Sequence, residues 1–140
     1  MISILIAEDL DLLREDMTEL LNAQPDMQVV GTASTGAKIL ELAKSVKSDV
    51  VLMDIEMESL SAGIMAAEAI RGAGIDTRVV YLTAHETEKT ILTAMATGAA
   101  DYIVKGCPDA ELLEHIRSVY AGHPVMDSRI QEVVLEEYSR

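Results

Sequence analysis

The sequence predicts an α/β fold, a doubly wound parallel sheet of five strands with helices on both faces. Five short apolar runs alternate strictly with segments of helical periodicity. The third run is apolar throughout, as is typical of strands buried on both faces of a parallel sheet. Strict alternation favours a parallel sheet covered on both faces. With right-handed crossovers, the simplest topology has the strand order 2-1-3-4-5.

Each expected strand is a short apolar run between polar or turn-forming residues. The first lies near the N-terminus, and the third is the clearest because it is the most continuously apolar. We expect strands at residues 2–7, 27–33, 49–53, 78–82 and 102–104.

The segments between the strands place apolar residues three and four positions apart, which is the spacing of one helix face. In the first helix this inward face is Leu10, Leu13, Met17, Leu20 and Leu21. The second spans about residues 37–46 and the third about 63–73. The fourth spans 89–97 and stops at a glycine, and the fifth is opened by a proline and runs to Gly122, with Tyr120 on its apolar face.

The chain has 140 residues and is 49% hydrophobic, which suits a single domain with a real core. Because it contains no Phe or Trp, that core must be largely aliphatic. We assign residues 1–122 to the domain. Residues 123–140 are expected to form a C-terminal helix or an interdomain linker, and no DNA-binding domain is recognisable in this chain.

The formal net charge of −13 disfavours direct binding to nucleic acid or to a membrane surface. No apolar stretch approaches the roughly 20 residues that a membrane span requires. The single cysteine, Cys107, excludes an internal disulfide. These features predict a soluble cytoplasmic protein.

Polar residues follow four of the five expected strands. Glu8 and Asp9 follow the first, Asp54 the third, Thr83 the fourth and Lys105 the fifth. Each has a simple structural explanation on its own: Asp9 could cap a helix, and Glu8 or Lys105 could be solvated surface charges. Parallel sheets bind ligands at the carboxyl ends of their strands, so the complete set favours a functional site.

The residue types in this set suit phosphoryl chemistry. Three clustered carboxylates repel one another, and Mg²⁺, which prefers carboxylate and water oxygens, relieves that cost. A carboxylate can attack phosphorus to form an acyl phosphate. The transfer mainly requires positioning and the cancellation of oxygen charge, which a metal, an ammonium and a hydroxyl can supply.

Four stretches make the sequence resemble response-regulator receiver domains over about residues 1–122. They are Ile6–Asp9, Val51–Met57, Val80–Ala84 and Gly98–Lys105. The resemblance is strongest to regulators with a LuxR-type helix-turn-helix output domain. It implies the flavodoxin-like receiver fold and a two-component signalling function.

The resemblance implies a role for each site residue. Asp54 resembles the phosphoacceptor and Asp9 the direct Mg²⁺ ligand. Glu8 resembles a ligand that acts largely through water. The backbone carbonyl of Glu56 resembles the third protein ligand.

Three further residues resemble catalytic or switch residues of the family: Lys105 is catalytic, Tyr102 is a switch residue and Thr83 is both. Lys105 corresponds to the lysine that pairs with the phosphoryl group, and Thr83 to the hydroxyl that moves toward it. Tyr102 stands where the family has a rotating aromatic residue, although a half-buried strand residue explains it equally well.

The sequence departs from the family pattern at two places. Glu58 stands where members usually have proline, and the loop from Glu58 to Gly63 is one residue longer than usual. Gly106 follows Lys105 where many members have proline, so the cis preference of an X–Pro bond is absent and a looser placement of the lysine is expected. His115 and His123 form no ligand group with Cys107 and are expected at the surface.

The resemblance implies a signalling switch that catalyses only its own phosphoryl transfer and dephosphorylation. Its expected partners are a cognate sensor histidine kinase and a second copy of the chain in a phosphorylation-modulated homodimer. DNA would be bound only through an output domain. Two alternatives stay open: a Toprim-like Mg²⁺ phosphotransferase, whose acid-x-acid pair Asp54–Glu56 imitates, and a pseudo-receiver that only binds partners.

Overall fold

The computed structural model describes residues 1–84 and 87–122, and within them five strands alternate with five helices. The strands are β1 (Ile2–Ala7), β2 (Met27–Ala33), β3 (Val50–Asp54), β4 (Arg78–Thr83) and β5 (Asp101–Val104). The helices are α1 (Asp11–Asn22), α2 (Gly36–Ser45), α3 (Ala62–Gly72), α4 (Glu88–Ala96) and α5 (Asp109–Tyr120).

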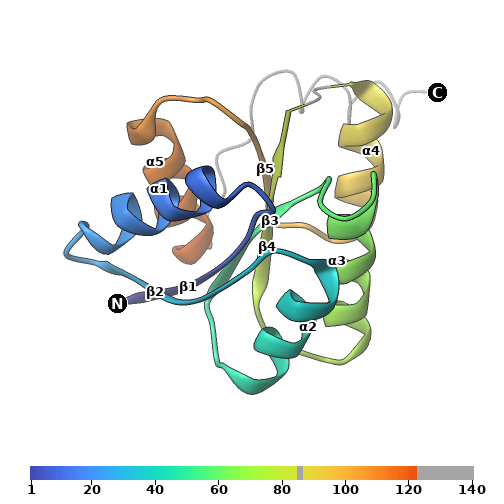
Figure 1. Ribbon diagram of the computed structural model, residues 1–140, viewed down its shortest axis with the longest axis horizontal. Coiled ribbons are helices and arrows are strands. Elements are labelled where there is room, and N and C mark those ends of the chain that lie inside the picture. Colours follow the sequence, from blue (N-terminus) through green and yellow to red (C-terminus); the bar gives the residue numbers. More distant parts are fainter. Residues whose placement is uncertain (85–86, 123–140) are drawn as a thin grey trace.

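The strands form one parallel sheet in the order β2-β1-β3-β4-β5, which confirms the predicted topology. Helices α1 and α5 cover one face, and α2, α3 and α4 cover the other (Figure 1). Every residue of the central strand β3 is buried, because helices cover it on both sides.

Two apolar clusters lie on opposite faces of the sheet, because successive side chains of a strand point to opposite faces. On the α1–α5 face, Ile4, Leu52 and Ile103 pack with helix residues such as Met17 and Ile116. On the other face the cluster includes the following residues: Leu5, Val51, Tyr81, Tyr102, Ile39, Ala66 and Ile91. The core is therefore mainly aliphatic, as the composition requires.

Two residues expected on helix faces are exposed instead. Leu10 precedes α1 and is 59% exposed, so the helix begins one residue later and buries Met17 and Leu21. Tyr120 is the last residue of α5 and is 44% exposed. Because Leu10 stands before the first helical residue and Tyr120 is the last one, periodicity alone overextends the buried face at these two ends.

Side chains hold the C-terminal part of α5 in place. The Nη1 atom of Arg78 on β4 donates hydrogen bonds of 2.9 and 3.0 Å to the carbonyls of Val119 and Tyr120. Arg117 pairs with Asp26 in the loop before β2 at 2.9 Å. The Arg78 contacts satisfy carbonyls at the end of α5, and the Arg117–Asp26 pair joins the helix to the loop before β2.

In the part of the chain that the structure describes, none of the helices combines the length and apolar character that a membrane span needs. The expected cytoplasmic location stays a prediction. The expected helix or linker at 123–140 lies outside the described residues, as does His123.

Candidate functional site

Two acidic residues stand at the carboxyl end of β1. Glu8 is fully buried and Asp9 is exposed. The Nη1 atom of Arg14 donates a hydrogen bond of 2.9 Å to the backbone carbonyl of Glu8 and so fixes the loop. The N-cap of α1 is Leu10, which makes no side-chain cap. Neither simple explanation therefore holds: Glu8 is not a solvated charge, and Asp9 does not cap the helix.

Asp54 is the last residue of β3 and is 1% exposed. Its Oδ1 atom accepts a hydrogen bond of 3.3 Å from the backbone N–H of Glu56. At Gly63 the start of α3 comes so close that an added Cβ would lie 2.0 Å from the carbonyl oxygen of Asp54. Only glycine fits there, and this close approach sets where the β3–α3 loop leaves the site.

Lys105 follows β5 and points its ammonium group into the cluster. The Nζ atom lies 2.9 Å from Asp54 Oδ2 and 3.0 Å from Glu8 Oε2. Gly106 adopts a φ of 86°, and no cis peptide bond occurs in residues 1–84 and 87–122. Lys105 thus reaches two carboxylates without the proline that many family members have at position 106.

The cluster has an excess of negative charge. Glu8, Asp9 and Asp54 each offer a carboxylate oxygen, and these oxygens all lie within 4.8 Å of one another. Burial raises the pKa of Asp54 to about 7; the hydrogen bond from Lys105 opposes this rise and the Glu8 carboxylate adds to it. Burial lowers the pKa of Lys105, but hydrogen bonds to Asp54 and Glu8 outweigh it, so the net pKa is above its usual value.

The donor set fits a hard divalent cation such as Mg²⁺, which takes carboxylate, carbonyl and water oxygens. Among the residues that the structure describes, the buried Oε2 of Glu8 lies 3.0 Å from the Lys105 ammonium and has no partner with hydrogen-bond geometry. A buried charged oxygen without a hydrogen bond is costly, and a cation or its water ligands would satisfy it.

Thr83 and Tyr102 lie on the neighbouring strands β4 and β5. Thr83 ends β4, is 2% exposed and pairs with Val104 of β5. Tyr102 is 1% exposed, more buried than the half-buried strand residue considered from the sequence, and its side chain belongs to the apolar cluster that includes Ile91 and Ala94 of α4. The ring lies in the apolar core on the face of the sheet that α2, α3 and α4 cover.

His115 is buried, so its expected surface position was wrong. It is 5% exposed, and its Nδ1 lies 2.5 Å from Oδ2 of Asp101. The other oxygen of Asp101 accepts a 2.8 Å hydrogen bond from the backbone N–H of Tyr102. The hydrogen bond to Asp101 raises the pKa of His115, although burial opposes the rise. A sequence signal existed, since His115 lies three residues after Leu112, on the apolar face of α5.

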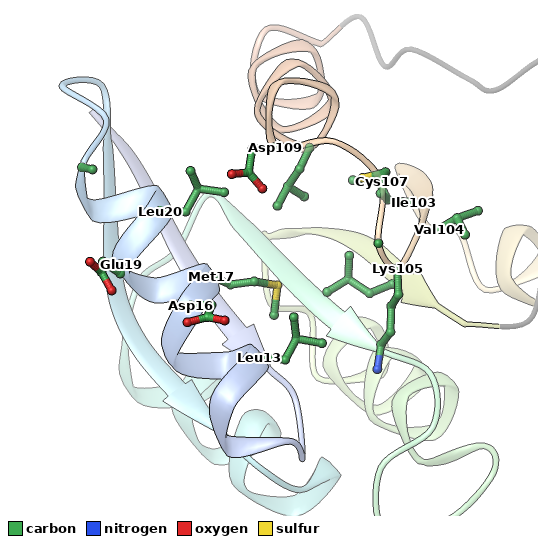
Figure 2. Close-up of a pocket in the computed structure, with 14 residues that line it drawn as sticks. Leu13, Asp16, Met17, Glu19, Leu20, Ile103, Val104, Lys105, Cys107 and Asp109 are labelled. Atoms are coloured by element: carbon green, nitrogen blue, oxygen red, sulfur yellow. The ribbon is translucent and has the colours of Figure 1, made fainter.

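A cleft of about 560 Å³ opens between α1 and the β5–α5 segment, with Lys105 at one end. Figure 2 shows Leu13, Met17 and Leu20 along one wall, with Ile103 and Cys107 on the other side. Acidic residues also line the cleft: Asp16, Glu19 and Asp109. The cleft is apolar inside and negatively charged at its edges.

Fold and site together define a class: a doubly wound α/β protein with an acid–lysine cluster at the carboxyl edge of its sheet. The chain belongs to the response regulator receiver domain family, because the family model matches residues 4–117. It is a receiver domain of the two-component type, and the Toprim-like alternative is thereby excluded.

Individual relatives agree with this assignment. The oxygen regulatory protein NreC of Staphylococcus aureus is 33% identical over 135 residues, which cover 96% of this chain and 62% of NreC. A two-component response regulator of the LuxR family from Aurantimonas sp. SI85-9A1 superposes with a TM-score of 0.87 at 27% identity, covering 99% of both chains. The signal receiver domain of the putative regulator NarL from Mycobacterium tuberculosis gives 0.82 at 30% identity, covering 87% of this chain and 98% of that one.

The chain spans about three fifths of the length of the curated relatives that it matches. The similarity therefore concerns the receiver part.

Proposed function

We propose that residues 1–122 form a phosphorylation-driven switch whose phosphoacceptor is Asp54 and whose cofactor is Mg²⁺. One observation carries the proposal: a buried Asp54 shares one small volume with Glu8 and Asp9 and pairs with Lys105 at 2.9 Å. A structural ion pair would not need two further carboxylates beside it. A phosphoryl-accepting site does, because the metal requires ligands.

The ligands would come from three segments. Asp9 and Asp54 supply carboxylate oxygens, Glu56 supplies its backbone carbonyl, and Glu8 acts largely through water. Bound Mg²⁺ would offset the negative charge of the oxygens that surround phosphorus during transfer. The proximity of the three carboxylate oxygens supports this set.

In the transfer step, a carboxylate oxygen of Asp54 attacks the phosphorus atom of the donor. A new O–P bond forms as the bond from phosphorus to the donor breaks, and the bonding electrons leave with the donor. The ammonium of Lys105 then pairs with a phosphoryl oxygen, and the hydroxyl of Thr83 holds another. Water then attacks the phosphorus atom, the O–P bond to Asp54 breaks, and inorganic phosphate leaves as the Asp54 carboxylate is regenerated. The domain thus catalyses only its own phosphorylation and dephosphorylation.

The output would begin at Thr83 and Tyr102. Phosphorylation draws the Thr83 hydroxyl toward the phosphoryl group and biases the position of the Tyr102 ring against α4. Such a change is a shift in population between two packings of the α4–β5–α5 surface. The burial of Tyr102 in the same apolar cluster as Ile91 and Ala94 supports a link between this ring and α4.

The proposed partners follow from the family and from the surface. A cognate sensor histidine kinase would supply the phosphoryl group, and the apolar cleft beside Lys105 suits a docking helix with basic flanks. A phosphorylation-modulated homodimer would position two output domains on paired DNA half-sites. DNA would be contacted through such a domain and not through this segment, whose net charge is −13.

Phosphorylation can be tested with acetyl phosphate as donor and intact-mass measurement as readout. The wild-type chain is expected to gain one phosphoryl group with Mg²⁺ and none with excess chelator. Asp54→Asn should gain none, whereas the exposed-loop control Asp76→Asn should be labelled like wild type. Labelling of Asp54→Asn to the wild-type level would disprove the assignment. If the wild-type chain is never labelled, the alternative hypothesis is favoured, namely a pseudo-receiver that only binds partners.

A further inference from the structure

The loop between β3 and α3 is joined to the start of α2 by the side chain of Glu58. Both carboxylate oxygens lie within hydrogen-bond distance of the backbone nitrogen of Gly36, at 3.0 and 2.9 Å. Gly36 is the first residue of α2, and its N–H is one of those that a helix cannot satisfy internally. The partial positive charge at a helix N-terminus strengthens the attraction for a carboxylate.

The same loop passes beside Asp54. The N–H of Glu56 donates to Asp54 Oδ1 at 3.3 Å, and the N–H of Met57 donates to the carbonyl of Ser59 at 3.1 Å, which turns the chain back. Glu58 lies within that turn, between the segment beside Asp54 and the start of α3. Its contact with α2 therefore holds the middle of the loop from the outside.

The packing around Gly36 leaves little freedom for this arrangement. A Cβ added at Gly36 would lie 3.2 Å from the carbonyl oxygen of Ala62 and 3.7 Å from Glu58 Oε2. The start of α2, the start of α3 and the Glu58 carboxylate thus meet at one point. Movement of the loop would have to break the Glu58 contact.

We infer that Glu58 is a positioning residue for the metal site: by anchoring the β3–α3 loop on α2, it holds the carbonyl of Glu56 beside Asp54. The inference rests on the proposed function, because it requires that this carbonyl binds Mg²⁺. Position 58 is also where the resembling proteins usually have proline, whose ring restricts φ. In this chain a hydrogen bond to a helix end replaces that restriction.

Charge offers a competing explanation that the experiment must separate. Glu58 lines the same hollow as Asp9, Asp54 and Glu56, so its negative charge could attract a cation without positioning anything. Glu58→Gln removes the charge but keeps an oxygen that can accept from Gly36. Glu58→Ala removes both. Glu41→Ala, on the exposed side of α2, removes one charge away from the site.

Mg²⁺ binding to the unphosphorylated chain would be measured by isothermal titration calorimetry, together with hydrogen exchange at the Gly36 amide. Glu58→Ala should weaken Mg²⁺ binding about 5-fold, which is roughly the net contribution of one ordinary hydrogen bond at an exposed position. Glu58→Gln should stay within about 2-fold of wild type, because an amide oxygen still accepts the bond. Exchange at Gly36 should be faster only in Glu58→Ala, and Glu41→Ala should match wild type in both measurements.

Two results would overturn the inference alone. Equal weakening in Glu58→Gln and Glu58→Ala would mean that charge is responsible, and wild-type affinity in Glu58→Ala would mean that Glu58 only caps α2. Failure of the wild-type chain to bind Mg²⁺ would overturn the proposed function as well. These outcomes are distinguishable because wild type and variants are titrated side by side.

Discussion

The two ends of β5 each hold a buried ion pair, and they differ in charge balance. At the carboxyl end, Lys105 lies 2.9 Å from Asp54 and 3.0 Å from Glu8, with Asp9 close by, so three carboxylates face one ammonium. At the amino end, His115 pairs with Asp101 alone at 2.5 Å.

The hydrogen bonding differs in the same way. Both oxygens of Asp101 are bonded, one to His115 and the other to the N–H of Tyr102. Within the described part of the chain, Oε2 of Glu8 has an ion-pair contact with Lys105 at 3.0 Å but no hydrogen bond. A balanced and satisfied pair fixes packing, whereas an unbalanced cluster with an unsatisfied oxygen is suited to bind something else. Burial alone therefore does not separate a structural pair from a functional one.

The largest expected effect is on phosphoryl transfer at the unbalanced end. Lys105→Ala removes the ammonium that would pair with the phosphoryl oxygens, so labelling by acetyl phosphate should slow about 100-fold. Lys47→Ala, an exposed lysine between α2 and β3, is the control and should be labelled at the wild-type rate. Initial rates from intact-mass time courses give the comparison. Equal rates for the two variants would remove Lys105 from the mechanism.

At the balanced end the expected effect is on stability. His115→Ala leaves Asp101 buried without its partner, which should lower the free energy of unfolding by about 3 kcal/mol. The rate of phosphorylation should remain within about 2-fold of wild type. Urea unfolding measures the loss, with the exposed neighbour Glu114→Ala as control. If His115→Ala is as stable as Glu114→Ala, the pair is not structural.

A smaller change in stability, in the stabilising direction, is expected when Asp54 is replaced. Its pKa of about 7 exceeds the unfolded value of 3.8, so its contribution is fully present below pH 3.8 and is lost as the pH rises through 7. Without Mg²⁺ at about pH 8, Asp54→Asn should therefore be more stable than wild type by about 2 kcal/mol. Urea unfolding in chelator tests this, and added Mg²⁺ should shrink the difference. If Asp54→Asn is less stable than wild type in chelator, the claim that the cluster carries a destabilising excess of negative charge is contradicted.

The contrast between the two ends also shows what the sequence could reveal. Strand order and the cluster at the carboxyl edge were predictable, because alternating apolar runs set the topology and topology sets where strands end. The burial of Glu8 was harder to predict from the sequence, because the loop that encloses it depends on Arg14, six residues later. Helix boundaries were correct to within one or two residues.

The pair at the amino end was not predicted. Asp101 and His115 lie 14 residues apart, and nothing in their spacing shows that one strand and one helix bring them together. A histidine on an apolar helix face needs a buried partner, and the sequence does not identify it. The Glu58 contact with Gly36 was unpredictable for the same reason, because 22 residues separate the two.

The most direct test of the account is a Mg²⁺ titration followed by amide chemical shifts along the whole chain. The largest shifts are expected at Asp9, Asp54 and Glu56, with little change at Asp101 and His115 and loss of the response in Asp54→Asn. Saturable shifts of similar size at both ends of β5, or shifts that persist in Asp54→Asn, would contradict the claim that the unbalanced cluster is the functional site.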